Sequence, residues 1–285
     1  MWYNFKGDNM LKVIEKNGDV YLENLSPFVL KDTLDCGQAF RWQEINENEF
    51  CGIAMNKFLH IIQTDDCVIF KNTTKEQFYD TWYNYFDCER DYNEILSALS
   101  VNDTLKKVCD FSSGIRLLNQ EPFEAICSFI ISQNNNIPRI KGIISRLCEN
   151  FGDKIDGGYT FPSAEKIASL CEDDLSVIRA GFRAKYIIDG AKKTASGEID
   201  FDFLRNAPID KAREHIMQIK GVGPKVADCA LLFGFSRMEC FPVDVWIRKA
   251  VNSLFGGEVP ECALPYAGIA QQYIFHYARK NNIKL

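Results

Sequence analysis

The sequence predicts an α+β protein, in which an N-terminal antiparallel β-sheet domain precedes a larger all-helical domain that carries a helix–hairpin–helix motif. Short apolar segments separated by turn-forming residues fill the first part of the chain. After about residue 74, apolar side chains recur every three or four positions, and prolines mark helix starts as far as the C-terminus. We expect the sheet domain, with flanking helices, at residues 1–110 and the helical domain at residues 111–285.

The strand predictions depend on apolar segments that lie too close together for crossover helices, which favours antiparallel meanders. Clusters typical of turns separate these segments at residues 17–19, 46–48 and 65–66. The predicted strands cover residues 20–22, 40–42, 50–53, 58–62 and 67–70.

The change to helical periodicity begins with four aromatic residues that fall on one helix face. These are Phe78, Trp82, Tyr85 and Phe86. Further helix starts are expected where prolines occupy plausible first-turn positions. These prolines are Pro122, Pro138, Pro162, Pro208, Pro224 and Pro265.

Composition excludes several classes of protein. No apolar run approaches the roughly 20 residues that cross a bilayer, and the first residues do not resemble a signal peptide. We therefore expect an intracellular, cytoplasmic protein, associated with the nucleoid in a bacterium.

The 11 cysteines are scattered without a Cys-x-x-Cys pair, which argues against a zinc ribbon and a disulfide framework. Only Cys262 follows Cys240, so the C-terminal region lacks the four ligands of an iron–sulfur cluster.

The net charge of −6 argues against a broad basic surface for nucleic acid. The acidic excess lies within residues 1–100, however, and residues 101–285 carry slightly more basic than acidic side chains. A protein that grips a few phosphates with backbone amides needs no large basic field. The charge therefore remains compatible with a compact DNA-binding surface.

A short connection at residues 219–225 predicts a helix–hairpin–helix at about residues 208–235. Gly221 and Gly223 allow a sharp turn and a close approach to a ligand, with Val222 between them. Pro224 then opens a helix whose free N–H groups make an anion site suited to phosphate. The alternative is an ordinary joint between two helices of a bundle.

Lys225 and Asp244 are the candidate catalytic residues. Lys225 lies in the first turn of a helix, where the dipole disfavours a positive charge and so favours the neutral, nucleophilic amine. Asp244 precedes an apolar-periodic segment, where it would cap a helix and stay ionised. An ionised carboxylate near Lys225 could stabilise the charge that develops on a sugar as its base departs. The alternatives are a phosphate-binding lysine and a simple helix cap.

The sequence resembles the 8-oxoguanine DNA glycosylase family, within the helix–hairpin–helix glycosylases. Six ordered motifs carry the resemblance over most of the chain, at residues 37–42, 133–140, 181–186, 221–229, 242–245 and 270–275. The hairpin motif alone would identify only the superfamily. The segments around Gly37 and around Gln271 and Phe275 indicate this particular branch.

The resemblance implies a bifunctional DNA glycosylase and AP lyase. The damaged nucleotide would be flipped out of the duplex. Lys225 would attack the sugar C1′ to give a Schiff base, Asp244 would assist as electrostatic partner and base, and the strand would be cleaved by β-elimination. The expected partner is double-stranded DNA that contains oxidised guanine. We expect a monomer that needs no cofactor.

The resemblance also implies how the base is read. The Gly37 carbonyl would accept a hydrogen bond from N7–H of the oxidised base, whereas normal guanine presents an acceptor there. Gln271 would bind the Watson–Crick edge, and Phe275 would stack on the ring from the same helix face. Cys229 and Pro242 complete the expected base-binding set. Some of these residues also have a purely structural alternative. Gly37 could be a plain turn glycine, Gln271 a solvent-facing side chain beside a core Phe275, and Cys229 a core residue.

Further residues are expected to hold the DNA. In the family, the residue at Asn134 fills the gap left by the flipped base and contacts the opposite cytosine, with Arg139 and Arg183 assisting. Phe182 stands where eukaryotic members carry a tyrosine wedge, and Trp246 stands where they carry a histidine. These departures, with Pro138 beside the asparagine run, weaken the expectation of a strict preference for cytosine. A surface position for Arg183 is the alternative.

The resemblance further suggests a structural cation at the hairpin carbonyls, although no metal is required for the chemistry. Two other functions stay open at the level of sequence. One is a helix–hairpin–helix glycosylase for another damaged base, and the other is a non-catalytic DNA-binding module.

Overall fold

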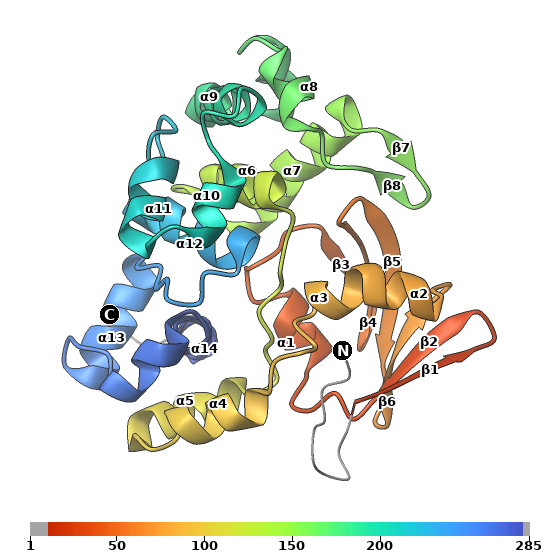
Figure 1. Ribbon diagram of the computed structural model, residues 1–285, viewed down its shortest axis with the longest axis vertical. Helices are drawn as coiled ribbons and strands as arrows, with labels where there is room; N and C mark the ends of the chain where they lie inside the picture. Colours follow the sequence, from red (N-terminus) through yellow and green to blue (C-terminus); the bar gives the residue numbers. More distant parts are fainter. Residues whose placement is uncertain (1–10, 282–285) are drawn as a thin grey trace.

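The N-terminal part of the protein forms a six-stranded antiparallel sheet in the order β1-β2-β6-β5-β4-β3 (Figure 1). The structure is a computed structural model and describes residues 11–281. Each neighbouring pair of strands is antiparallel, as the short connections predict. The strands are β1 Lys12–Lys16, β2 Asp19–Glu23, β3 Trp42–Asn46, β4 Glu49–Ala54, β5 Lys57–Gln63 and β6 Cys67–Lys71.

The predicted strands at residues 20–22, 50–53, 58–62 and 67–70 coincide with β2, β4, β5 and β6. The strand predicted at residues 40–42 was placed too early, because β3 begins at Trp42. Phe40 packs instead in the helical core, and Arg41 pairs with Glu124 at 3.2 Å. The β1 strand was not predicted, because its side chains are mostly exposed and show no apolar pattern.

The rest of the chain is helical apart from a small hairpin, and none of its described helices is long and apolar enough to cross a membrane. The helices are α1 Leu30–Leu34, α2 Lys75–Gln77, α3 Tyr83–Tyr85, α4 Tyr92–Leu99, α5 Asp103–Ser112, α6 Pro122–Ser132, α7 Ile137–Phe151, α8 Ala164–Ala168, α9 Ala184–Ala195, α10 Phe201–Asn206, α11 Ile209–Ile216, α12 Pro224–Phe235, α13 Val245–Phe255 and α14 Ala267–Lys280. A π-helical turn at Phe78–Trp82 joins α2 to α3, and 3₁₀ turns occur at Asp174–Ile178, Gly181–Arg183 and Glu261–Tyr266. The hairpin consists of β7 Lys154–Ile155 and β8 Gly158–Tyr159.

Most of the predicted helix starts agree with the structure. Pro122 and Pro224 are the first residues of α6 and α12, and Pro208 is the N-cap of α11. Pro265 is an exception, since it lies inside the 3₁₀ turn before α14. That turn redirects the chain, and α14 begins only at Ala267.

Two apolar cores hold the fold together. The sheet core contains the four aromatic residues predicted to share a helix face, and all four are buried there. The helical core includes side chains from α4 and α5 as well as from α6 to α14. Leu118, which follows α5, returns to the sheet core. The two cores are therefore interleaved along the chain, and the division near residue 110 stays a prediction.

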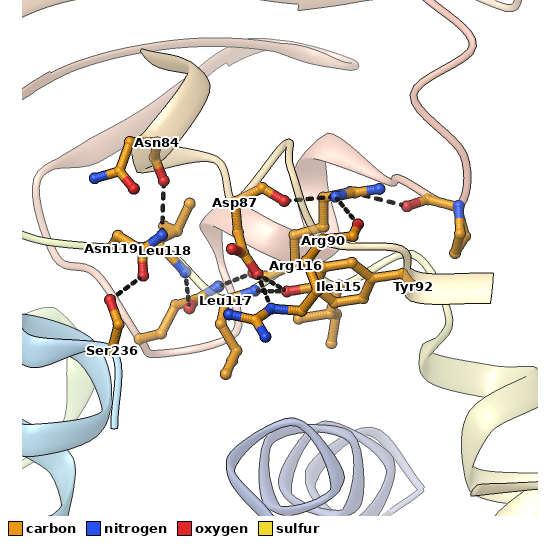
Figure 2. A network of polar contacts seen from close by, with 12 residues as sticks. Asn84, Asp87, Arg90, Tyr92, Ile115, Arg116, Leu117, Leu118, Asn119 and Ser236 are labelled. Carbon is orange, nitrogen blue, oxygen red and sulfur yellow. Dashed lines mark hydrogen bonds and ion pairs between the residues drawn. The ribbon is translucent and has the colours of Figure 1, made fainter. Parts of the chain in front are cut away.

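A buried polar network supports the segment that passes between the two cores (Figure 2). The Arg116 guanidinium donates to the carbonyls of Asp87 at 2.7 Å and Pro27 at 3.3 Å, and it lies over the Tyr92 ring. Asn119 joins the two parts of the protein, because it donates to the Asn84 carbonyl. It also accepts from Ser236, just beyond α12, at 2.6 Å. Asn119 therefore links α3, which packs in the sheet core, to the C-terminal end of α12, the helix that carries Lys225.

Replacing Arg116 by methionine is expected to lower the free energy of unfolding by about 3 kcal/mol, because buried carbonyls lose their donors. Arg116 is 3% exposed, so water does not replace the guanidinium. Urea unfolding of the two proteins would measure the difference. Lys106→Met is the matched control, since Lys106 pairs with Asp110 on an exposed helix face and is expected to change stability by less than about 1 kcal/mol. Equal effects of the two substitutions would contradict the role given to Arg116.

Candidate active site

The hairpin between α11 and α12 presents an open helix N-terminus. Gly221 has φ +77°, and a Cβ there would collide with the Tyr186 ring, so the turn accepts only glycine without rearrangement. Gly223 is the N-cap of α12 and makes no side-chain cap, and the space beside it is open. The first-turn N–H groups of α12 are therefore available to an anion.

Lys225 occupies the first turn of α12 and is partly buried. Its Nζ lies 5.7 Å from the centre of the Phe129 ring, which comes from α6. Cys229 follows one turn later and is buried. Burial raises the pKa of the Cys229 thiol. The nearby Lys225 ammonium opposes this shift as a charge and as a hydrogen-bond partner.

Asp244 is the N-cap of α13, where its Oδ1 accepts from the Ile247 N–H at 2.7 Å. This contact holds the carboxylate in one orientation and leaves the second oxygen available. The Asp244 charge reaches the same thiol as Lys225, because it adds to the upward shift in the pKa of Cys229. Lys225 and Asp244, which are far apart in sequence, therefore both lie near the buried thiol of Cys229.

A second convergence joins α14 to the segment before Asp244. Gln271 is buried and donates from Nε2 to the Pro242 carbonyl at 3.2 Å. Its Oε1 is buried as well, and no described residue donates a hydrogen bond to it. An unpaired buried acceptor costs about 1–3 kcal/mol, so the site is suited to a ligand that brings a donor. The alternative of a solvent-facing glutamine is wrong.

Gly37 lies against the same helix, on the side of Phe275. It has φ +88°, and a methyl group on its Cα would lie 3.3 Å from Ile137 Cδ1 and 3.7 Å from Phe275 Cε1. The flanking carbonyls are both occupied, since Cys36 accepts from Gln272 and Gln38 accepts from Gln120. The Gly37 carbonyl accepts nothing from the part of the chain that the structure describes. Among these three carbonyls, the one of Gly37 is thus the acceptor that a ligand can use.

The asparagine loop and the Phe182 turn form one exposed unit. Asn134 is exposed with φ +52°, and Phe182 is 52% exposed. Arg183 lies between them and is 2% exposed, so the alternative of a surface arginine is wrong. Its guanidinium donates to the carbonyls of Gln133 and Asn134 and lies 4.4 Å from the Phe182 ring centre. This geometry makes Arg183 a positioning residue for the loop, and its contact with cytosine stays a prediction.

The remaining predicted DNA contacts lie at the surface. Arg139 follows the loop in the first turn of α7 and is exposed, and Trp246 is 42% exposed in the first turn of α13. Near the predicted cation site, the Gln218 carbonyl accepts from Lys193 Nζ at 2.9 Å, and the Ile219 carbonyl accepts from the Val222 N–H. Both carbonyls already have donors, so the hairpin cation stays a prediction.

The comparisons with known proteins agree over most of the chain. Residues 20–126 match the 8-oxoguanine DNA glycosylase N-terminal domain, and residues 127–260 match the HhH-GPD superfamily of base excision DNA repair proteins. The N-glycosylase/DNA lyase of Saccharomyces cerevisiae is 30% identical over an alignment of 260 positions, and the alignment covers 79% of this chain and 68% of the relative.

Two solved structures resemble the chain over almost its full length. A Clostridium acetobutylicum 8-oxoguanine glycosylase/lyase, bound to double-stranded DNA with cytosine opposite 8-oxoG, is 39% identical with a TM-score of 0.88. That similarity covers 96% of this chain and 98% of the other. MBOgg1 in complex with a low-affinity DNA ligand is 38% identical with a TM-score of 0.90, covering 96% and 99% of the two chains.

This chain belongs to the 8-oxoguanine DNA glycosylase family. The membership confirms the predicted family, the predicted fold and the enzyme class, a DNA glycosylase with AP lyase activity. DNA is accordingly its macromolecular partner. The alternative of a non-catalytic DNA-binding module is set aside on the same ground.

Several residues that shape this glycosylase site were not predicted from the sequence. Gln120 and Gln272 hold the carbonyls on either side of Gly37, and Phe129 lies beside the candidate lysine. The sequence offered one signal, which is that Gln271 and Gln272 are adjacent in an apolar helix. A glutamine buried there must find a hydrogen-bond partner for its amide. No sequence pattern indicated that Phe129 lies beside Lys225, because a phenylalanine in an apolar helix is usually a core residue.

A cavity of about 710 Å³ lies away from these residues, between the sheet and α7. Its lining includes Arg41, Lys141 and Glu149 but neither Lys225 nor Asp244. We place the candidate active site at Lys225 and Asp244 rather than in this cavity, because a site is identified by its reactive side chains and not by its volume alone.

Proposed function

We propose that this protein excises 8-oxoguanine from double-stranded DNA through a Schiff base on Lys225 and then cleaves the strand. The observation that carries the proposal is the convergence of two pairs of residues on one site. Lys225 and Asp244 both lie near Cys229, and Gln271, which shares a face of α14 with Phe275 beside Gly37, donates to the Pro242 carbonyl two residues before Asp244. The first pair supplies chemistry, and the second pair supplies a place for a base.

The base-binding residues complement the oxidised guanine. The free Gly37 carbonyl accepts from N7–H, which 8-oxoguanine has and guanine lacks. The buried Gln271 Oε1 accepts from the N–H donors on the Watson–Crick edge, and this contact satisfies the oxygen that has no protein partner. Phe275 provides a ring on which the base stacks. On guanine the N7 lone pair would instead face the Gly37 carbonyl.

Lys225 and Asp244 have different roles in the reaction. The neutral Lys225 amine attacks C1′ and forms the C–N bond, while the bond from C1′ to the base breaks and its electron pair leaves with the base. Asp244 stabilises the positive charge on the sugar during this step, because its carboxylate is fixed by the Ile247 N–H. The nitrogen then loses a proton and the C1′–O4′ bond breaks, with O4′ taking up a proton, which opens the sugar ring and gives the Schiff base. Removal of a C2′ proton from the Schiff base expels the 3′ phosphate, which is the β-elimination step.

The DNA contacts follow from the exposed groups around the site. The open N-terminus of α12 receives a backbone phosphate at Gly221, Val222 and Gly223. Asn134 and Phe182, held together by Arg183, enter the duplex where the lesion leaves it. Arg139 and Trp246 contact the strands on either side. The monomeric state and the cytoplasmic location stay predictions from the sequence.

Single-turnover assays on duplexes with one defined lesion test the proposal. We expect release of 8-oxoguanine followed by strand cleavage, and no release of guanine from the matched undamaged duplex. Thymine glycol serves as the competing lesion, and 8-oxoguanine is placed opposite each of the four bases. Equal release of thymine glycol and 8-oxoguanine would refute the assignment to oxidised guanine.

Gly37→Ala is expected to slow excision of 8-oxoguanine at least about tenfold, because the methyl group strains a residue at φ +88° and crowds Ile137 beside the base. Strand cleavage at a preformed abasic site is expected to change much less, since no base needs to bind. Gly197→Ala is the matched control, because Gly197 has φ +77° and open space around it. If both substitutions slowed excision equally, backbone strain alone would explain the effect.

A further inference from the structure

Arg279 lies on the base-binding face of α14. Gln271, Phe275 and Arg279 are spaced four residues apart, so their side chains follow one stripe along the helix. The methyl group imagined on Gly37 would lie 3.9 Å from Arg279 Nη1. The guanidinium therefore reaches the loop whose carbonyl is free, next to the ring of Phe275.

Arg279 is exposed, and it has no hydrogen bond or ion pair with any residue in the described range 11–281. Its charge favours the C-terminal end of α14 through the helix dipole, but Lys280 supplies the same benefit one position later. Stabilisation of the helix thus does not explain why a guanidinium extends back toward Gly37. A donor group with unused hydrogen-bonding capacity stands at the edge of the base site.

We propose that Arg279 is a specificity-determining residue that donates a hydrogen bond to the C8 oxygen of the flipped 8-oxoguanine. The proposal rests on the proposed function, and it adds a second point at which the oxidised base is distinguished from guanine. Oxidation changes two adjacent ring positions, giving a carbonyl oxygen at C8 and an N–H at N7. An acceptor beside a donor matches this pair, and Gly37 and Arg279 provide both.

A guanidinium can distinguish 8-oxoguanine from guanine because it only donates hydrogen bonds. Arginine carries only N–H donors and stays protonated, so it binds an oxygen acceptor and rejects a donor. Guanine has a C–H bond at C8, which offers Arg279 no acceptor there. A backbone phosphate is the other oxygen that a guanidinium could bind. The position beside Gly37 and Phe275 favours the base edge, whereas the open end of α12 is the phosphate site.

Binding measurements with two duplexes separate the base from the phosphate. We would use Lys225→Gln protein, which cannot turn over, and add Arg279→Leu or, as the matched control, Lys280→Leu. One duplex carries 8-oxoguanine opposite cytosine, and the other carries tetrahydrofuran, which keeps the phosphates but has no base. Arg279→Leu is expected to weaken binding to the first duplex about tenfold and to leave binding to the second within about twofold. Lys280→Leu should change both equally and slightly.

Each outcome has a definite meaning. Equal weakening on both duplexes would overturn the inference and make Arg279 a phosphate contact. No weakening on either duplex would also overturn the inference, and the charge of Arg279 would then only stabilise the C-terminal end of α14. These results are read only if wild-type protein excises 8-oxoguanine, because failure of that activity would refute the proposed function itself. An active wild type with an indifferent Arg279→Leu variant would refute this inference alone.

Discussion

Lys225→Gln is expected to abolish covalent trapping by borohydride on duplexes that contain 8-oxoguanine, and to lower strand cleavage by at least on the order of 10³-fold. The physical reason is that glutamine has no nucleophilic amine, so no Schiff base forms and nothing is reduced. The substitution keeps a polar chain of similar length in the first turn of α12. DNA binding and thermal stability are therefore expected to remain close to those of the wild type.

Lys220→Gln is the matched control for Lys225→Gln. Lys220 belongs to the same hairpin, but its side chain is exposed and lies 3.5 Å from the Asp189 carboxylate. It is expected to trap with borohydride like the wild type. Trapping that persisted in Lys225→Gln and was lost in Lys220→Gln would move the nucleophile to the other lysine. Trapping that persisted in both variants would exclude a hairpin lysine altogether.

Asp244→Asn is expected to lower the single-turnover rate of 8-oxoguanine release by about 10²–10³-fold while leaving stability almost unchanged. Asparagine caps a helix about as well as aspartate, so the hydrogen bond to the Ile247 N–H is preserved. The substitution removes the negative charge that faces the sugar and little else. The experiment therefore separates the electrostatic role of Asp244 from its structural role.

Two further variants complete the test of Asp244. Asp244→Ala is expected to lose the cap as well, with about 1 kcal/mol less stability in denaturant unfolding. Asp200→Asn changes a capping aspartate on α10 in the same way, and it is expected to leave excision unaffected. Should Asp244→Asn release the base at the wild-type rate, Asp244 would be a helix cap and nothing more.

The helices and their hairpin were largely predictable, because the signals that define them are local. Pro224 after two glycines indicates a helix start, and the spacing of Phe78, Trp82 and Tyr85 indicates a buried helix face. The strands β2, β4, β5 and β6 were found for the same reason. The β1 strand was missed because its side chains are mostly exposed and show no apolar pattern.

The candidate residues were predicted from motifs, but their environments were not. Arg183 illustrates the difference, since a surface arginine and a buried one look alike in sequence. Its burial depends on the carbonyls of Gln133 and Asn134, which the turn after α6 directs toward it. Arg279 was not predicted at all, because an arginine near the end of a helix has an ordinary explanation in the helix dipole.

The sequence by itself determined the order of the elements, the hairpin and the candidates for the reactive pair, because periodicity, glycine and proline act over a few residues. Only the tertiary structure brings Gln271 to the Pro242 carbonyl and Gly37 to Phe275, and decides which of their polar atoms are free. Packing of α12 against α6 and of α14 against α13 sets these positions. A buried polar atom is available to a ligand only when no distant neighbour already binds it.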